Sequence, residues 1–75
     1  MNEPVVVEIA SDQTHEKVVA EIIVDGKFVC VLSNDHDELI VEFPGPGLDE
    51  SLVARTVSLE SLLRGVEIAK ARLRV

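Results

Sequence analysis

The side chains best suited to chemistry lie in one polar stretch, residues 34–38, which reads Asn-Asp-His-Asp-Glu. Carboxylates and imidazole bind divalent cations, and His36 could also serve as a general base. The stretch lacks both the twelve-residue spacing of a calcium loop and a paired Cys/His motif. Adjacent side chains in a tight loop cannot all point inward. We therefore expect a solvated hairpin loop and no metal site.

Other reactive residues are few. Cys30 alternates with Phe28 and Leu32 along an apolar stretch, so we expect a buried, unreactive thiol. No Ser or Cys lies in a nucleophile motif, and no glycine pattern typical of phosphate binding is present. The sequence predicts no catalytic residue, no cofactor and a non-enzymatic protein. A metal-assisted enzyme using His36 and the acids beside it is the distant alternative.

Length and composition indicate one domain over residues 1–75, with 47% hydrophobic and 28% charged residues. The longest apolar run, residues 28–32, is far too short to span a bilayer. Residues 1–4 lack the basic cluster and apolar stretch of a secretory signal, and the lone cysteine excludes an internal disulfide. These features predict a cytoplasmic location.

Charge is distributed unevenly along the chain. The net charge is −7, with −10 in residues 1–50 and +3 in residues 51–75. The negative charge repels nucleic acid and anionic membranes, and the absence of Trp and Tyr removes side chains on which bases could stack. The charge instead favours a basic partner. Solubility alone is the competing explanation for the acidity.

Apolar alternation predicts four strands: residues 5–10, 17–24, 27–33 and about 38–43. Asp25-Gly26 between the second and third strands is a strong hairpin signal. The Pro-Gly-Pro-Gly stretch at 44–47 ends the fourth strand, and residues 48–56 form a connection with a turn of helix or a short extended piece.

A helix is expected from Leu59 to Leu73, with Ser58 as its cap. Its predicted sheet-facing stripe contains Leu59, Leu62, Leu63, Val66, Ala69 and Leu73, while Ile68 lies opposite. The expected fold is α+β: an antiparallel four-stranded β-meander with one C-terminal helix packed on one face, in the order β-β-β-β-α.

Both faces of the predicted sheet are apolar. The richer face, expected under the helix, contains Val18, Ala20, Ile22, Val24, Phe28, Cys30, Leu32, Leu39, Val41 and Phe43. The opposite face carries Val19, Ile23, Val29, Val31 and Ile40, plus part of the first strand, interspersed with Lys17, Glu21, Glu38 and Glu42. Burying one large aliphatic side chain stabilises by about 1.5–3 kcal/mol, so leaving five exposed is unfavourable. We predict that these five form a protein interface, in a homodimer or with another partner; shielding by residues 48–56 is the alternative.

Two stretches carry a resemblance to known families. Residues 42–47, Glu-Phe-Pro-Gly-Pro-Gly, and the helix start Ser58-Leu59-Glu60-Ser61-Leu62-Leu63 resemble HicB-type antitoxin domains over about residues 17–75. One residue and an Asp of the family's proline-glycine segment are missing. The patterns at 20–22, 25–26, 32–33 and 42–44 are similar to small acidic bacterial immunity and uncharacterised proteins. Both resemblances imply stoichiometric binding of a toxin.

The sequence thus predicts a small, non-enzymatic bacterial protein-binding module, antitoxin- or immunity-like, that binds a basic protein and forms a homodimer. A stand-alone oligomeric domain with a structural or small-ligand role is the alternative.

Overall fold

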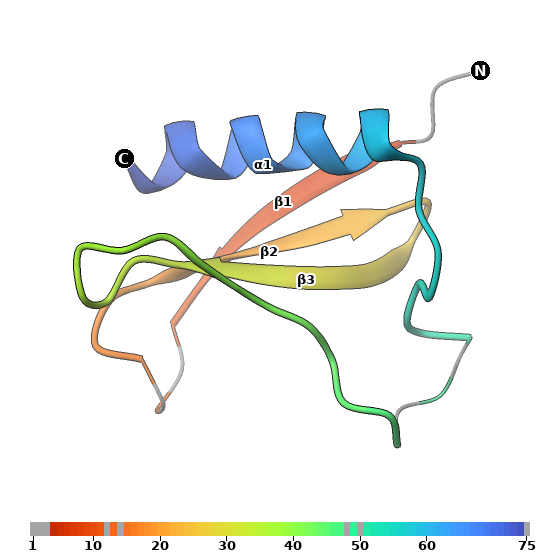
Figure 1. Cartoon of the computed structure of the whole chain (residues 1–75), viewed down its shortest axis with the longest axis horizontal. Coiled ribbons are helices and arrows are strands. Elements are labelled where there is room, and N and C mark those ends of the chain that lie inside the picture. The colour runs from red at the N-terminus through yellow and green to blue at the C-terminus, as the bar shows by residue number, and fades with distance from the viewer. Residues whose placement is uncertain (1–3, 12, 14, 48, 50, 75) are drawn as a thin grey trace.

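One antiparallel sheet and one helix make up the protein in the computed structural model, which describes residues 4–11, 13, 15–47, 49 and 51–74. The elements are β1 (Val5–Ala10), β2 (Val19–Val24), β3 (Lys27–Ser33), β4 (Ile40–Glu42) and α1 (Leu59–Leu73). The strands lie in the order β1-β2-β3-β4, and α1 covers one face of the sheet (Figure 1). The predicted α+β meander with a C-terminal helix is confirmed.

The β2–β3 hairpin contains an irregularity that alternation alone does not reveal. Asp25 and Gly26 both have positive φ, 53° and 79°, as a two-residue primed turn requires. Ile22 then pairs with Cys30, but Ile23 pairs with Phe28, so Val29 is an extra residue in β3. This β-bulge shifts which side chains of β3 face α1.

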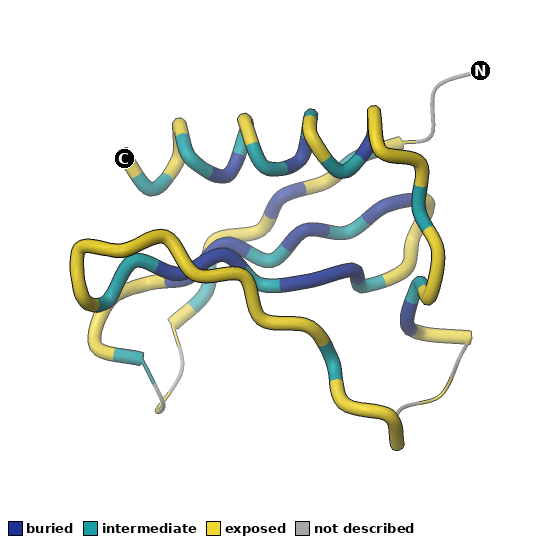
Figure 2. The backbone as a smooth tube through the Cα atoms, in the orientation of Figure 1, coloured by how far each residue is buried: buried dark blue, intermediate teal, exposed yellow. Residues whose placement is uncertain are grey.

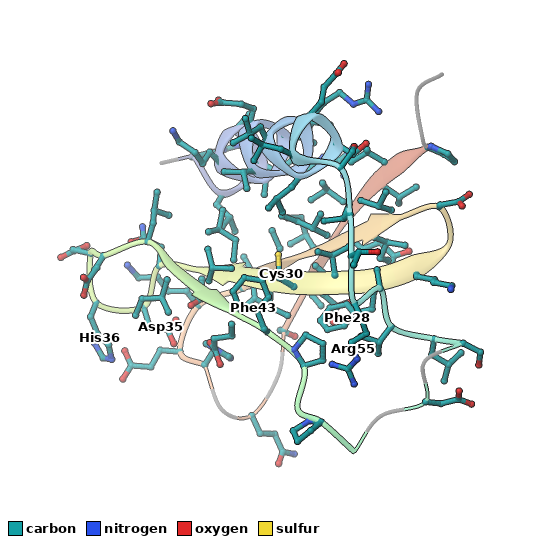
Figure 3. The ribbon with its side chains drawn as sticks, turned by 45° about the vertical axis from the view of Figure 1, so that its right-hand side comes forward. Phe28, Cys30, Asp35, His36, Phe43 and Arg55 are labelled. Atoms are coloured by element: carbon teal, nitrogen blue, oxygen red, sulfur yellow. The ribbon has the colours of Figure 1, made fainter. Side chains whose placement is uncertain are left out.

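The bulge corrects the prediction for Val29. Val29 is 4% exposed and belongs to the core cluster, together with Cys30. Phe28 instead lies on the far side of β3, whereas Cys30 points toward α1 (Figure 3). Two consecutive residues of a bulged strand can face the same side, so the assumed alternation of Phe28 and Val29 was wrong.

The core lies between α1 and the central strands (Figure 2). It consists of Val7, Ala20, Ile22, Val24, Val29, Cys30, Leu32 and Ala69. Cys30 has no exposed surface, and burial raises the pKa of its thiol. The predicted burial of this cysteine is confirmed.

Small residues bring α1 close to the sheet. Ser58 caps the helix by accepting a hydrogen bond from the Ser61 amide at 3.1 Å, as expected. The buried helix positions are Ser61, Gly65 and Ala69. A Cβ added at Gly65 would lie 2.7 Å from Cγ2 of Ile22, so only glycine permits this approach.

This close approach rotates α1 relative to the predicted stripe. Leu59 and Leu63, expected to face the sheet, are 67% and 54% exposed. Ile68, expected on the opposite side, packs against the core, as do Leu62, Val66 and Leu73. Four of the six predicted positions, Leu62, Val66, Ala69 and Leu73, therefore do pack toward the sheet, whereas the buried Ser61 and Gly65 were not in the predicted stripe.

The helix contacts β1 and β2, and β4 remains uncovered (Figure 1). Val18, Leu39 and Phe43 were expected beneath α1 but are 47%, 42% and 67% exposed. Two of them lie just outside the short β4, which spans only Ile40–Glu42, and Val18 precedes β2. A single helix is too narrow to cover four strands.

Part of the connection to α1 extends the sheet. The Phe28 amide donates to the Leu52 carbonyl at 3.0 Å, and the Ala54 amide donates to the Phe28 carbonyl at 2.9 Å. Val53 thereby forms a parallel bridge with Phe28 and is buried. This is the short extended piece foreseen as one alternative for residues 48–56. Among the described residues, no helix has the length and apolarity required to cross a membrane.

Candidate protein-binding face

The face of the sheet opposite α1, here called the second face, carries acidic residues on three of its four strands, in line with one another across the sheet. Val7, Ile22 and Cys30 pair with one another on the helix side, so their chain neighbours point to the second face. There Glu8 pairs with Glu21, Glu21 with Val31, and Val31 with Glu42. We call Glu8, Glu21 and Glu42 the acidic row.

Apolar side chains flank the acidic row. Toward the β2–β3 turn, pairing across neighbouring strands aligns Val6, Ile23, Phe28 and Val53. On the other side of the row, Ala10 pairs with Val19, and Ser33 pairs with Ile40. The second face is therefore a line of carboxylates between two largely apolar lines.

The five predicted interface residues differ in exposure and orientation. Ile23 and Val31 are half-buried on the second face, and Ile40 is 38% exposed at its edge. Val19 has the same orientation but is only 1% exposed, and Val29 lies in the core. Three of the five therefore remain accessible to a partner, and the chain itself covers part of this face.

Some residues of this face were missed from the sequence. Glu8 and Val6 belong to it because β1 pairs with β2 in a register that the pattern of β1 did not reveal. Phe28 belongs to it because of the bulge at Val29. The alternation of Val6, Glu8 and Ala10 with Val7 and Ile9 would have identified the first two, once the inward position of Val7 was known.

Two loops are tied together at one end of the second face. The carboxylate of Asp35 accepts hydrogen bonds from the amides of Lys17, at 3.1 Å, and Glu16, at 3.4 Å. His15 Nε2 lies 2.7 Å from Oε1 of Glu42, joining the β1–β2 loop to β4. The His15 contact holds Glu42 in place at one end of the acidic row, and the Asp35 hydrogen bonds fix the loop that carries His15.

The polar stretch at 34–38 thus has a structural use. Asp35 braces the β1–β2 loop, while His36 is exposed and directed away from the sheet (Figure 3). Asp37 lies 3.8 Å from the ammonium group of Lys17 and is fully open to solvent. Within the described ranges, no three His, Cys, Asp or Glu side chains converge as a metal site would require.

The second face suits a cationic side chain with an aliphatic stem. Lys and Arg bury their methylene groups on apolar surface while the charged end stays with an anion. Arg and carboxylate groups also form strong, charge-assisted hydrogen bonds. The acidic row supplies the anions, and Ile23, Val31 and Phe28 supply half-buried apolar surface beside them.

A cavity of about 410 Å³ lies between the β2–β3 turn and the last residues of the connection before α1. Its lining residues are Val24, Asp25, Lys27, Val53, Ala54, Arg55, Thr56 and Val57. Its described lining residues include no histidine or cysteine, and the two cations, Lys27 and Arg55, lie on different segments. The acidic row therefore remains the more distinctive candidate site.

Comparison with known proteins finds no matching family, no matching curated protein and no matching solved structure.

Proposed function

We propose that the chain is a small, non-enzymatic bacterial protein-binding module, antitoxin- or immunity-like, whose second face binds a basic protein. The observation that carries this proposal is the acidic row between two apolar lines. Glu8 and Glu21 are direct cross-strand neighbours, an arrangement that destabilises a sheet because like charges repel. A cationic partner would relieve this repulsion on binding.

The acidic row also selects among partners for this face. Two copies that docked through their second faces would bring Glu8, Glu21 and Glu42 toward the same residues of the other copy. Like charges at an interface cost several kcal/mol, so self-association here is disfavoured. A basic protein gains from the same charges, and it can cover Ile23 and Val31 as well.

The experiment uses a helical peptide probe that carries arginines at every fourth position and leucines beside them. Binding is measured by fluorescence anisotropy with wild-type protein and with the Glu8→Gln/Glu21→Gln variant. Charge-assisted hydrogen bonds contribute about 1.5–3 kcal/mol, so we expect at least a tenfold weaker affinity for the variant. Wild-type binding should also weaken with added salt.

A matched control removes the same net charge from the other side of the molecule. Glu60 and Glu67 are exposed on α1, so Glu60→Gln/Glu67→Gln should leave the affinity for the probe nearly unchanged. Equal loss of affinity in both double variants would mean that overall charge, not the acidic row, attracts the peptide. That result would refute the assigned face.

A further inference from the structure

A second exposed apolar surface lies on α1, away from the acidic row. Leu59 and Leu63 are 67% and 54% exposed, and Val66 beside them is half-buried. With Lys70, these residues have the spacing i, i+4, i+7 and i+11. That spacing places them on one side of a helix, as in the seam of a helix pair. We call Leu59, Leu63, Val66 and Lys70 the α1 seam.

We propose that the α1 seam binds the α1 seam of a second copy in antiparallel orientation. The charges along α1 match this orientation, with Glu60 in the first turn and Lys70 and Arg72 in the last. Aligning Leu63 with Val66 of the second copy puts Glu60 level with Ala69 of that copy, one residue from Lys70, and the two-fold axis repeats the pair. Antiparallel helices also place opposite dipole ends together.

The electrostatics of the whole chain favour a second copy at this surface. Residues 1–50 carry −10 and residues 51–75 carry +3, so two copies repel least when they meet through their helices. The second face, with its acidic row, remains free on the opposite side of the sheet. The homodimer that the sequence predicted through the second face is thus reassigned to α1.

Apolar surface beside α1 can extend the contact. Val41 pairs with the core residue Leu32 and so faces the helix side of the sheet, where it is 42% exposed. Leu39 and Phe43 flank it and are likewise exposed. Stable interfaces bury roughly 800 Å² on each partner, more than one helix flank provides, so β4 residues would contribute to the dimer.

Charge reversal tests the antiparallel pairing. Glu60→Lys would place lysine beside Lys70 of the second copy, and Lys70→Glu would place glutamate beside Glu60. Each single variant should raise the dimer dissociation constant at least tenfold in analytical ultracentrifugation. The double variant Glu60→Lys/Lys70→Glu should restore dimerisation, and so should a 1:1 mixture of the two single variants.

Recovery in the mixture cannot come from contacts within one chain. Residues 60 and 70 are about 15 Å apart along a helix, at 1.5 Å per residue, and each chain in the mixture keeps its own substitution. Circular dichroism of each variant establishes that α1 is still folded. Failure of both the double variant and the mixture to recover would refute the antiparallel alignment.

A matched pair of leucine substitutions tests the surface itself. Leu63→Glu should abolish the dimer, whereas Leu52→Glu should not, because Leu52 is exposed to solvent, even more than Leu63, but lies in the connection before α1. A wild-type protein that stays monomeric up to millimolar concentration would contradict the proposal. So would a dimer that survives Leu63→Glu. Neither result would affect peptide binding at the acidic row, so the two proposals fail separately.

Discussion

Both faces of the sheet carry aliphatic side chains, but their architectures differ. On the helix side, small helix residues allow α1 to approach until Ile22, Cys30 and Ala69 have no exposed surface. On the second face, loops and residues 52–54 cover the edges, while Ile23 and Val31 stay half-buried. The acidic row accounts for this difference, because burying a carboxylate is unfavourable unless it is paired. His15 contacts Glu42 within the chain, whereas Glu8 and Glu21 face each other across β1 and β2.

Substitution of neighbouring valines by lysine should separate the two faces most sharply. Val29→Lys places an ammonium group in the core cluster, where 4% exposure leaves no route to water. An unpaired buried charge costs several kcal/mol, comparable to the stability of a small domain, so we expect loss of the fold. Thermal melts monitored by circular dichroism measure it.

Val31→Lys is the companion substitution on the second face. The new ammonium group would lie between Glu21 and Glu42, its cross-strand neighbours, so the variant should remain folded. It should also lose affinity for the arginine peptide, because it neutralises the acidic row. If Val29→Lys folded and Val31→Lys did not, Val29 would face solvent and Val31 the core, which would contradict the orientation of β3 around the bulge.

Gly65→Ala should have the next largest effect, on the helix side. A Cβ at 2.7 Å from Cγ2 of Ile22 forces the helix or the side chain to shift, and overpacking of this kind costs about 1–3 kcal/mol. Helix propensity alone would predict a gain of up to about 1 kcal/mol. Urea denaturation should therefore show a net loss of stability.

The control for Gly65→Ala is Ala71→Gly at an exposed position of α1. It changes the helix propensity without touching the sheet and should cost close to 1 kcal/mol. If Gly65→Ala instead stabilised the protein, α1 would lie farther from β2 than it does in the structure.

These contrasts also mark what the sequence could and could not predict. Alternation, the Asp25-Gly26 turn and the Ser58 cap were sufficient for the meander and the helix, because each depends on local residues. The bulge at Val29 was not predictable, since an extra residue within a run of apolar side chains leaves the composition of the strand unchanged. Its effect was to exchange the sides of Phe28 and Val29.

The rotation of α1 was hidden for a different reason. The predicted stripe was built from apolar residues and included Ala69, but it omitted Ser61 and Gly65, whose small size lets the helix backbone approach the sheet closely. Similarly, Glu21 and Glu42 were expected on the second face, yet their alignment with Glu8 depends on strand register. The candidate site could therefore be identified only once the pairing of the strands was known.

The smallest expected effect concerns the stability of the acidic row. Because Glu8 and Glu21 oppose each other on exposed or half-buried positions, Glu8→Gln/Glu21→Gln should stabilise the free protein by about 0.2–1 kcal/mol. Added salt screens the repulsion, so the gain should shrink as ionic strength rises. Glu60→Gln/Glu67→Gln should give no such gain, since Glu60 lies in the first turn of α1 and stabilises the helix by interacting with the positive end of its dipole.

Thermal melts at low and high salt measure this difference. A double variant that is more stable but binds the arginine peptide more weakly would indicate that the chain keeps two opposed carboxylates for recognition at the expense of stability. A less stable variant would mean that Glu8 and Glu21 stabilise the sheet through contacts of their own. In that case repulsion within the acidic row could no longer be the reason why the second face needs a basic partner.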